Sequence, residues 1–214
     1  MAAFLYYDKV GQINFRIFLE RKLMKNVEVE IQVEIENTKP LVSLLEKEGK
    51  FIFFEHQIDH YYTPAHRDFK AIKPINEWLR LRNSDGKYSI TYKNWHRDEN
   101  KKSNHCDEYE TIIGEIDQLE KILNVLDFST VVIVDKKRKA YLFKDWEIAL
   151  DEVKNLGNFV EIEYKGETIR DQKEIADEMK DFLRSLNLGK IKINSVGYAY
   201  KLLNPDDDHL ESEL

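Results

Sequence analysis

The chain has 214 residues, of which 42% are hydrophobic and 34% are charged, a composition that predicts one globular domain with a full core. Its net charge of −7 excludes general nucleic-acid binding, which needs a basic surface. The single cysteine, Cys106, excludes an internal disulfide framework and fits a cytoplasmic protein, and no apolar run approaches the ~20 residues of a membrane span.

Residues 1–23 precede the first clear structural pattern. They lack the uninterrupted apolar core and small-residue cleavage site of a secretory signal. Because Met24 directly precedes an alternating segment, we interpret residues 1–23 as an N-terminal extension and residues 24–204 as one domain. Residues 205–214 are strongly acidic, and we expect them to form a disordered tail.

Residues 27–36 alternate apolar and polar side chains without a break, which is typical of a β-strand. Successive side chains point to opposite faces of a sheet. One face is therefore apolar and the other carries Glu28, Glu30, Gln32, Glu34 and Glu36. A second alternation over 159–164 presents Glu161 and Glu163 in the same way. Taken singly, each strand is also explained by a solvated sheet face.

The rest of the chain reads as strands with a few helices. Apolar spacing predicts helices over 38–49, 116–126 and 171–186. Residues 83–86 carry a hairpin signal between two strands, and Asp151 is expected to start a turn that ends at Gly157. Strands are expected over 51–62, around residues 80–82, and over 87–94, 106–113, 130–135, 139–148 and 158–164. About eight strands favour a mixed sheet or a closed antiparallel barrel.

Charged side chains recur at every second position in the middle of the chain. The basic ones are Arg80, Arg82, Lys93, Lys136 and Arg138, and the acidic ones are Glu108 and Glu110. If these strands share one sheet with converging charged faces, they supply cations for a polyanion and carboxylates for a divalent metal. The alternative is cross-strand ion pairing, with Glu108 and Glu110 paired to Lys136 or Arg138. Lys137 and Lys139 fall on the opposite face as surface charges.

Taken in order, these segments resemble the motifs of the CYTH superfamily, whose members share a triphosphate tunnel fold. The matching segments are residues 28–32, 57–62, 80–82, 91–93, 108–110, 136–138, 151 and 161–163. The first of them resembles an ExExK motif, except that Gln32 stands where the family has lysine. The pattern as a whole looks most like the branch of class IV adenylate cyclases.

The resemblance implies an α+β fold in which an eight-stranded antiparallel sheet closes into a barrel, with charges inside and helices outside. It implies that the tunnel binds substrate through Arg80, Arg82, Lys93, Lys136 and Arg138, with Glu108 and Glu110 as supporting acids. Of these, Arg82, Lys93 and Lys136 would also be catalytic. It also implies that Mg²⁺ or Mn²⁺ is held by Glu28, Glu30, Asp151, Glu161 and Glu163.

The implied function is that of a metal-dependent enzyme acting on a small-molecule triphosphate, foremost a class IV adenylate cyclase that converts ATP to cyclic AMP and pyrophosphate. Hydrolysis of inorganic or thiamine triphosphate would use the same groups. A module that binds polyphosphate or a nucleotide without turnover is a third alternative. Gln32 favours this last alternative, because an amide carries no positive charge. Monomers and homodimers both fit the resemblance.

Overall fold

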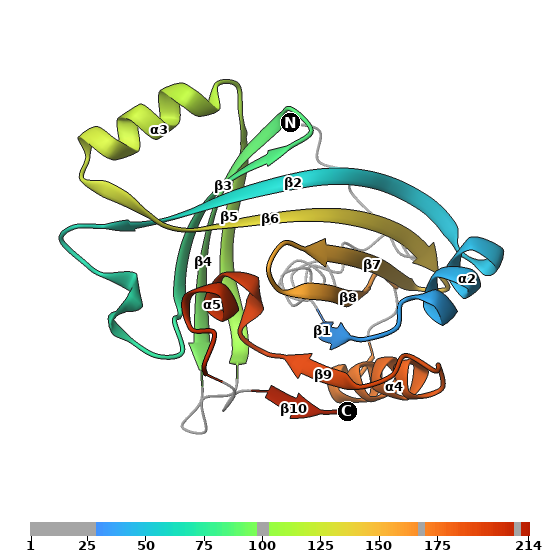
Figure 1. The fold of residues 1–214 in the computed structure, drawn as a ribbon. Coiled ribbons are helices and arrows are strands. Elements are labelled where there is room, and N and C mark those ends of the chain that lie inside the picture. The colour runs from blue at the N-terminus through green and yellow to red at the C-terminus, as the bar shows by residue number, and fades with distance from the viewer. Residues whose placement is uncertain (1–28, 98–102, 167–169, 208–210) are drawn as a thin grey trace, which may run out of the picture.

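The computed structural model describes residues 29–97, 103–166, 170–207 and 211–214. In these ranges the chain has an α+β fold with one antiparallel sheet and four α-helices (Figure 1). The strands are β1 (Glu30–Ile35), β2 (Lys50–Pro64), β3 (Glu77–Ser84), β4 (Lys87–Arg97), β5 (Ser103–Ile113), β6 (Phe128–Phe143), β7 (Trp146–Val153), β8 (Gly157–Tyr164), β9 (Ile191–Asn194) and β10 (Glu211–Glu213). The helices are α2 (Lys39–Glu48), α3 (Ile116–Val125), α4 (Gln172–Arg184) and α5 (Gly197–Leu203).

The sheet is open, which corrects the expectation of a closed eight-stranded barrel. Its ten strands follow the order β10-β9-β1-β8-β7-β6-β2-β3-β4-β5, so β10 and β5 are its two edges within the described residues. Closure would require the outer edge of β1 to pair with β5. Residues 33–35 of β1 instead pair with residues 191–193 of β9, and β10 extends that edge further.

The open sheet is nevertheless strongly curled. β2 and β6, of 15 and 16 residues, pair along their length and join the two ends of the sheet. In Figure 1, β3, β4 and β5 stand across the direction of β7, β8 and β1. The β2/β6 register shifts twice, between Phe51 and Phe53 and between Tyr61 and Tyr62, and such irregularities bend a sheet. The curl creates one concave face and one convex face.

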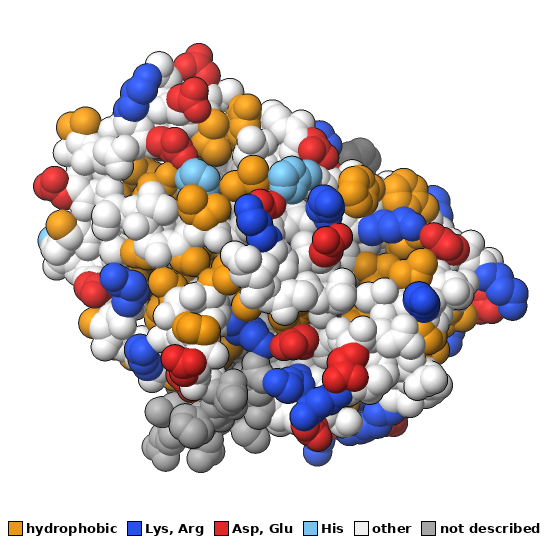
Figure 2. All heavy atoms as spheres, viewed as in Figure 1, with side chains coloured by type: hydrophobic (Ala, Val, Ile, Leu, Met, Phe, Trp, Pro, Cys, Tyr) orange, Lys and Arg blue, Asp and Glu red, His pale blue; other side chains and the backbone are white. Residues whose placement is uncertain are grey.

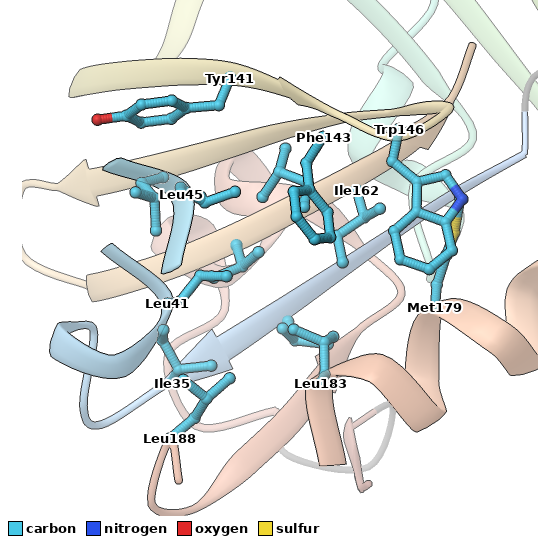
Figure 3. Close-up of a cluster of buried hydrophobic side chains, with 14 of the residues drawn as sticks. Ile35, Leu41, Leu45, Tyr141, Phe143, Trp146, Ile162, Met179, Leu183 and Leu188 are labelled. Atoms are coloured by element: carbon cyan, nitrogen blue, oxygen red, sulfur yellow. The ribbon is translucent and has the colours of Figure 1, made fainter. Parts of the chain in front are cut away.

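The main hydrophobic core lies on the convex side of β1, β8 and β7. Leu41 and Leu45 of α2, and Met179 and Leu183 of α4, pack there against the apolar faces of these strands, with Trp146 beside Met179 (Figure 3). The alternation of β1 has the same origin, because its apolar side chains face this core. α3 covers a smaller convex cluster around Leu81. None of the described helices is long and apolar enough to cross a membrane.

The three expected helices are confirmed as α2, α3 and α4. The hairpin signal is also confirmed, since Asp85 and Gly86 have φ of 47° and 84° between β3 and β4, the left-handed pair that two-residue hairpins prefer. Two strand predictions were wrong. β6 runs unbroken from Phe128 to Phe143, and Asp151 lies within β7 rather than at a turn. Within the acidic tail, Glu211–Glu213 form β10.

Candidate functional site on the concave face

The concave face gathers nearly all the charged residues that the sequence singled out. Arg82 of β3 lies opposite Asp59 of β2, and Arg80 lies opposite Thr91 of β4. Lys93 of β4 lies opposite Glu108 of β5, and Arg138 of β6 opposite Asp151 of β7. Because alternate side chains of each strand share a face, the i, i+2 spacing in the sequence becomes one continuous charged lining.

The outer surface is different in character. On the face of the molecule seen in Figure 2, acidic and basic side chains are interspersed and form no extended basic field. Lys137 is exposed on the convex side, and Lys139 pairs there with Glu46 at 3.0 Å, as the alternation predicted. The cationic residues that the sequence singled out lie instead on the concave face.

The first cluster on this face is built by β2 and β3. Arg82 donates through Nε and Nη2 to the two carboxylate oxygens of Asp59, both at 2.7 Å. Asp59 is only 2% exposed. Burial opposes its ionisation, but the bonds from Arg82 and the charges of Arg80 and Arg82 hold the pKa of Asp59 below its usual range. The bidentate pair fixes the plane of the Arg82 guanidinium.

Arg80, next to this pair, is only loosely engaged. Its Nη2 donates to Thr91 Oγ1 at 3.0 Å and lies 3.5 Å from Glu110, while Nη1 lies 3.7 Å from Asp59. Its Nε is buried and has no hydrogen-bond partner among the residues that the structure describes. A buried N–H without a partner is costly, so Arg80 Nε is an unsatisfied donor on the concave face.

The second cluster joins β6, β7 and β8. Arg138 donates to both oxygens of Asp151, at 2.7 and 2.6 Å, and to Glu161 at 2.6 Å. Lys136 donates to Asp151 at 3.1 Å, and the Tyr198 hydroxyl of α5 donates to the same carboxylate at 2.8 Å. Lys136 and Asp151 are only 3% and 2% exposed. Buried charges at this density require mutual pairing.

Burial and neighbouring charges shift the pKa values of the groups in this cluster. Burial opposes ionisation of Asp151 and Glu161, but Lys136 and Arg138 outweigh it, so the pKa of Asp151 falls well below its usual range and that of Glu161 falls to about 2. Burial, followed by the charge of Arg138, lowers the pKa of Lys136 to about 8, and the two carboxylates do not fully offset this. Lys136 is thus the lysine here that gives up its proton most readily.

A third group links the two ends of the sheet. Lys93 of β4 and Glu108 of β5 lie 2.8 Å apart. Burial lowers the pKa of Lys93, but the charges of Glu108 and of Glu30 on β1 outweigh burial and raise it. Glu30 therefore acts on β4 although β1 and β4 are not neighbours in the sheet. The curl brings the predicted cationic and acidic groups together without closing the barrel.

Glu108 and Glu110 belong to this side of the concave face. They contact Lys93 and Arg80 respectively, whereas the alternative explanation paired them with Lys136 or Arg138. That assignment was wrong because β5 is at the sheet edge next to β4, and β6 is three strands further away. The more general expectation of cross-strand ion pairs is confirmed for Glu108, which pairs with Lys93 on the adjacent strand.

The acidic residues suit a hard divalent cation in their donor chemistry. Glu30 on β1 lies directly opposite Glu163 on β8, and Glu161 shares the same face two residues away. Carboxylate oxygens are what Mg²⁺ and Mn²⁺ prefer. In this structure, Asp151 already pairs with the side chain of Arg138, and Glu163 pairs with Lys165. Glu28 lies outside the described residues.

Among the described residues, no three acidic, His or Cys side chains form a ready-made metal cage. Mg²⁺ is usually bound through one or two carboxylates together with substrate phosphates. The donor set therefore fits a cation that arrives with a phosphate ligand.

Sequence reasoning assigned no role to three contributors, although two of them lie in segments that match the family motifs. Asp59 alternates with Gln57 and Tyr61 on the concave face of β2, so its position in a period-2 pattern was the available signal. Tyr198 comes from α5, which lies against β6 on the inside of the curl (Figure 1). Nothing in the local sequence indicates that a seven-residue helix would lie there. Thr91 gave no signal beyond its place two residues before Lys93.

Most of this chain matches known proteins in sequence. The CYTH domain family model matches residues 24–197. A Methanocaldococcus jannaschii protein named as a candidate adenylate cyclase is 34% identical over 173 residues, covering 80% of this chain and 96% of that protein.

Two solved structures share the fold. A Pyrococcus horikoshii OT3 protein has a TM-score of 0.67 at 30% identity, covering 83% of this chain and 99% of its own. A candidate adenylyl cyclase of Hippeastrum, described as having a dominant triphosphatase activity, has a TM-score of 0.61 at 16% identity, covering 84% and 96% of the two chains.

Proposed function

This chain belongs to the CYTH domain family, and from that premise we propose that it is a metal-dependent enzyme acting on a small-molecule triphosphate bound at the concave face. The reaction we place first is that of a class IV adenylate cyclase, conversion of ATP to cyclic AMP and pyrophosphate. The name of the 34% identical relative supports this choice.

One observation carries the proposal. Within the described part of the chain, the buried Arg80 Nε lacks a partner, and the same lining also presents Arg82, Lys93, Lys136 and Arg138. A triphosphate carries about four negative charges, and guanidinium groups bind phosphate oxygens bidentately. A surface needing only internal ion pairs would have no reason to bury an additional, unsatisfied donor.

Each residue has a role in this scheme. Arg80, Arg82 and Arg138 bind and orient phosphate oxygens, and Lys93 and Lys136 supply point charges where negative charge develops in the transition state. Glu30, Glu161 and Glu163, with Asp151 and Glu28, would hold Mg²⁺ or Mn²⁺. When bound, that cation polarises the phosphoryl group as a Lewis acid. Lys136, with its pKa near 8, can hold or release a proton at Nζ near neutral pH.

Hydrolysis is a second candidate, and one feature favours it. Tyr198 and Tyr200 of α5, together with Trp78 and Phe159, form a buried apolar cluster at one end of the concave interior. An adenosine group would need space of this apolar kind, which α5 already fills. Inorganic triphosphate has no such requirement, and attack by water on its terminal phosphorus would use the same cations.

A product-resolved assay distinguishes these candidates. Purified protein is incubated with Mg²⁺ or Mn²⁺ and, separately, ATP, thiamine triphosphate or inorganic triphosphate, and cyclic nucleotide is resolved from orthophosphate. We expect cyclic AMP with pyrophosphate from ATP. Orthophosphate instead would identify a triphosphatase. Tight binding without product would overturn the enzymatic proposal and leave a binding module.

A further inference from the structure

Gln32 occupies the position where the first-strand motif has lysine, and its contacts are specific. It lies on β1 directly opposite Glu161 on β8. Its Nε2 donates to Glu161 Oε2 at 3.1 Å, and its Oε1 accepts a hydrogen bond from Asn194 Nδ2 at the end of β9. Gln32 thus bridges a carboxylate of the proposed active site and the corner between β9 and α5.

The orientation of both amides follows from their neighbours. The backbone N–H groups of Val196 and Gly197 donate to Asn194 Oδ1, at 3.3 and 3.1 Å. Because backbone N–H groups can only donate, the oxygen of Asn194 must face them and its NH₂ must face residue 32. The side chain at position 32 must therefore accept from Asn194 and donate to Glu161.

Glutamine meets both requirements with one neutral group, and lysine does not. A lysine ammonium has three donors and no acceptor, so at position 32 it would face the NH₂ of Asn194. Turning the Asn194 amide over would relieve that clash but would remove the acceptor from Val196 and Gly197. The structure thus gives a reason for glutamine at a position where the motif has a cation.

The bridge also fixes how Glu161 is presented. Glu161 Oε2 accepts from Gln32 Nε2 and from Arg138 Nη2, at 3.1 and 2.6 Å. Among the described residues, Oε1 has a single long contact, to Arg138 at 3.4 Å. We propose that Gln32 is a positioning residue whose amide is oriented by Asn194. In this orientation Gln32 holds Glu161 so that Glu161 Oε1 keeps its lone pairs for a divalent cation. This inference rests on the proposed function for the identity of the ligand.

A double-mutant cycle tests the match. Asn194→Asp places a carboxylate where Gln32 needs a donor facing it, and Gln32→Lys places an ammonium against an NH₂. In the double variant, the ammonium introduced at position 32 can donate both to Glu161 and to the carboxylate introduced at position 194. The other oxygen of that new carboxylate still accepts from Val196 and Gly197. Two changes that are each harmful should therefore compensate one another.

The readout is the affinity for Mn²⁺, measured by calorimetry in the presence of inorganic triphosphate, together with urea denaturation of the metal-free proteins. We expect each single variant to weaken Mn²⁺ binding at least tenfold and the double variant to return within about threefold of the parent. Asn37→Asp, which adds the same charge at an amide that bonds the Asn187 carbonyl outside the site, should stay within twofold.

Single variants that bind Mn²⁺ like the parent, or a double variant weaker than both, would overturn the inference. Failure of the proposed function looks different, because the parent itself would then bind no Mn²⁺ with triphosphate. In that case the urea data still test whether the side chains at positions 32 and 194 complement one another. A double variant less stable than either single variant would overturn that complementarity.

Discussion

Arg82 and Asp59 form a tightly constrained ion pair on the concave face. Asp59 is 2% exposed and accepts two 2.7 Å bonds from one guanidinium. Removing the partner of a buried carboxylate destabilises the folded protein far more than removing the partner of an exposed one, because water cannot replace the lost hydrogen bonds. The pair therefore has a structural role besides the proposed phosphate role of Arg82, and the two roles can be separated by experiment.

Replacing Arg82 with glutamine should lower the free energy of unfolding by about 3 kcal/mol, since Asp59 would keep only Arg80 at 3.7 Å. Urea denaturation measures this. The double variant Arg82→Gln, Asp59→Asn should recover at least half of the loss, because it removes the orphaned charge. A single variant as stable as the parent would show that Asp59 finds other compensation.

Lys136 should make stability depend on alkaline pH. Its pKa falls from 10.5 to about 8 on folding, so between these values the unfolded chain binds a proton that the folded chain has released. Stability from this group therefore rises with pH across that window, and the cost of burying the charge is fully present below pH 8.

Urea denaturation at pH 7.5, 9 and 10 tests this linkage. The parent should gain about 2 kcal/mol relative to Lys136→Gln over this range. Lys137→Gln, one residue away on the exposed face, should keep the gain of the parent. If Lys136→Gln and the parent changed in parallel with pH, Lys136 would not be the titrating group.

At the scale of elements, α5 is the piece that completes the second cluster. Tyr198 packs edge-on against Phe159, with ring centroids 4.9 Å apart, and its ring lies 5.0 Å from Lys136 Nζ. Lys201 pairs with Glu34 of β1 at 2.7 Å. Polar contacts therefore hold the helix to β1 and β7, and ring contacts hold it to β6 and β8.

Tyr198→Phe should lower the free energy of unfolding by about 1.5 kcal/mol. The ring packing remains, and only the 2.8 Å bond to Asp151 is lost. Chemical denaturation provides the measurement, and Tyr109→Phe, at a ring that is 68% exposed, should change stability by less than about 0.5 kcal/mol. Equal effects of the two substitutions would show that the Tyr198 hydroxyl does not stabilise the second cluster.

Sequence patterns located most elements but not their closure. Alternation found β1, β8 and the charged faces because period 2 follows directly from strand geometry. The break between β6 and β7 was misplaced, since the turn at Lys144, with φ of 55°, carries no glycine or proline to mark it. Whether β1 pairs with β5 or β9 depends on long-range geometry, so the open sheet could not be foreseen.

Within the site, the sequence likewise identified which residues gather but not how they pair. Arg80, Arg82, Lys93, Lys136 and Arg138 do share the concave face, as expected. Local patterns gave no means of predicting that Arg138 would bond both Asp151 and Glu161, because those acids lie on β7 and β8 and meet it only through the sheet order.

In the whole molecule, all five proposed phosphate ligands contact acidic residues, and two of these acids are proposed metal ligands. Arg138 and Lys136 are paired with Asp151, and Arg138 also with Glu161. A triphosphate bound alone would take the basic residues and leave these acids without partners. A metal cation bound alone would take the acids and leave the basic residues without partners. Because either arrangement buries unpaired charge, we expect the two ligands to bind cooperatively.

Thermal denaturation can measure this linkage. Mg²⁺ alone and inorganic triphosphate alone should each raise Tm by less than about 2 °C, whereas both together should raise it by more than the sum of the two. Removing the cation with a chelator should reverse the combined shift. Additive shifts would contradict the exchange of ion pairs and indicate independent sites.

The most direct test of the charged concave face is a calorimetric titration of inorganic triphosphate in Mg²⁺ against the parent, Lys136→Gln and Lys137→Gln. These lysines are neighbours on β6 but lie on opposite faces of the sheet. We expect Lys136→Gln to bind at least tenfold more weakly, in keeping with the loss of one charged hydrogen bond, while Lys137→Gln binds within twofold of the parent. Equal affinities in all three proteins would contradict a triphosphate site on the concave face.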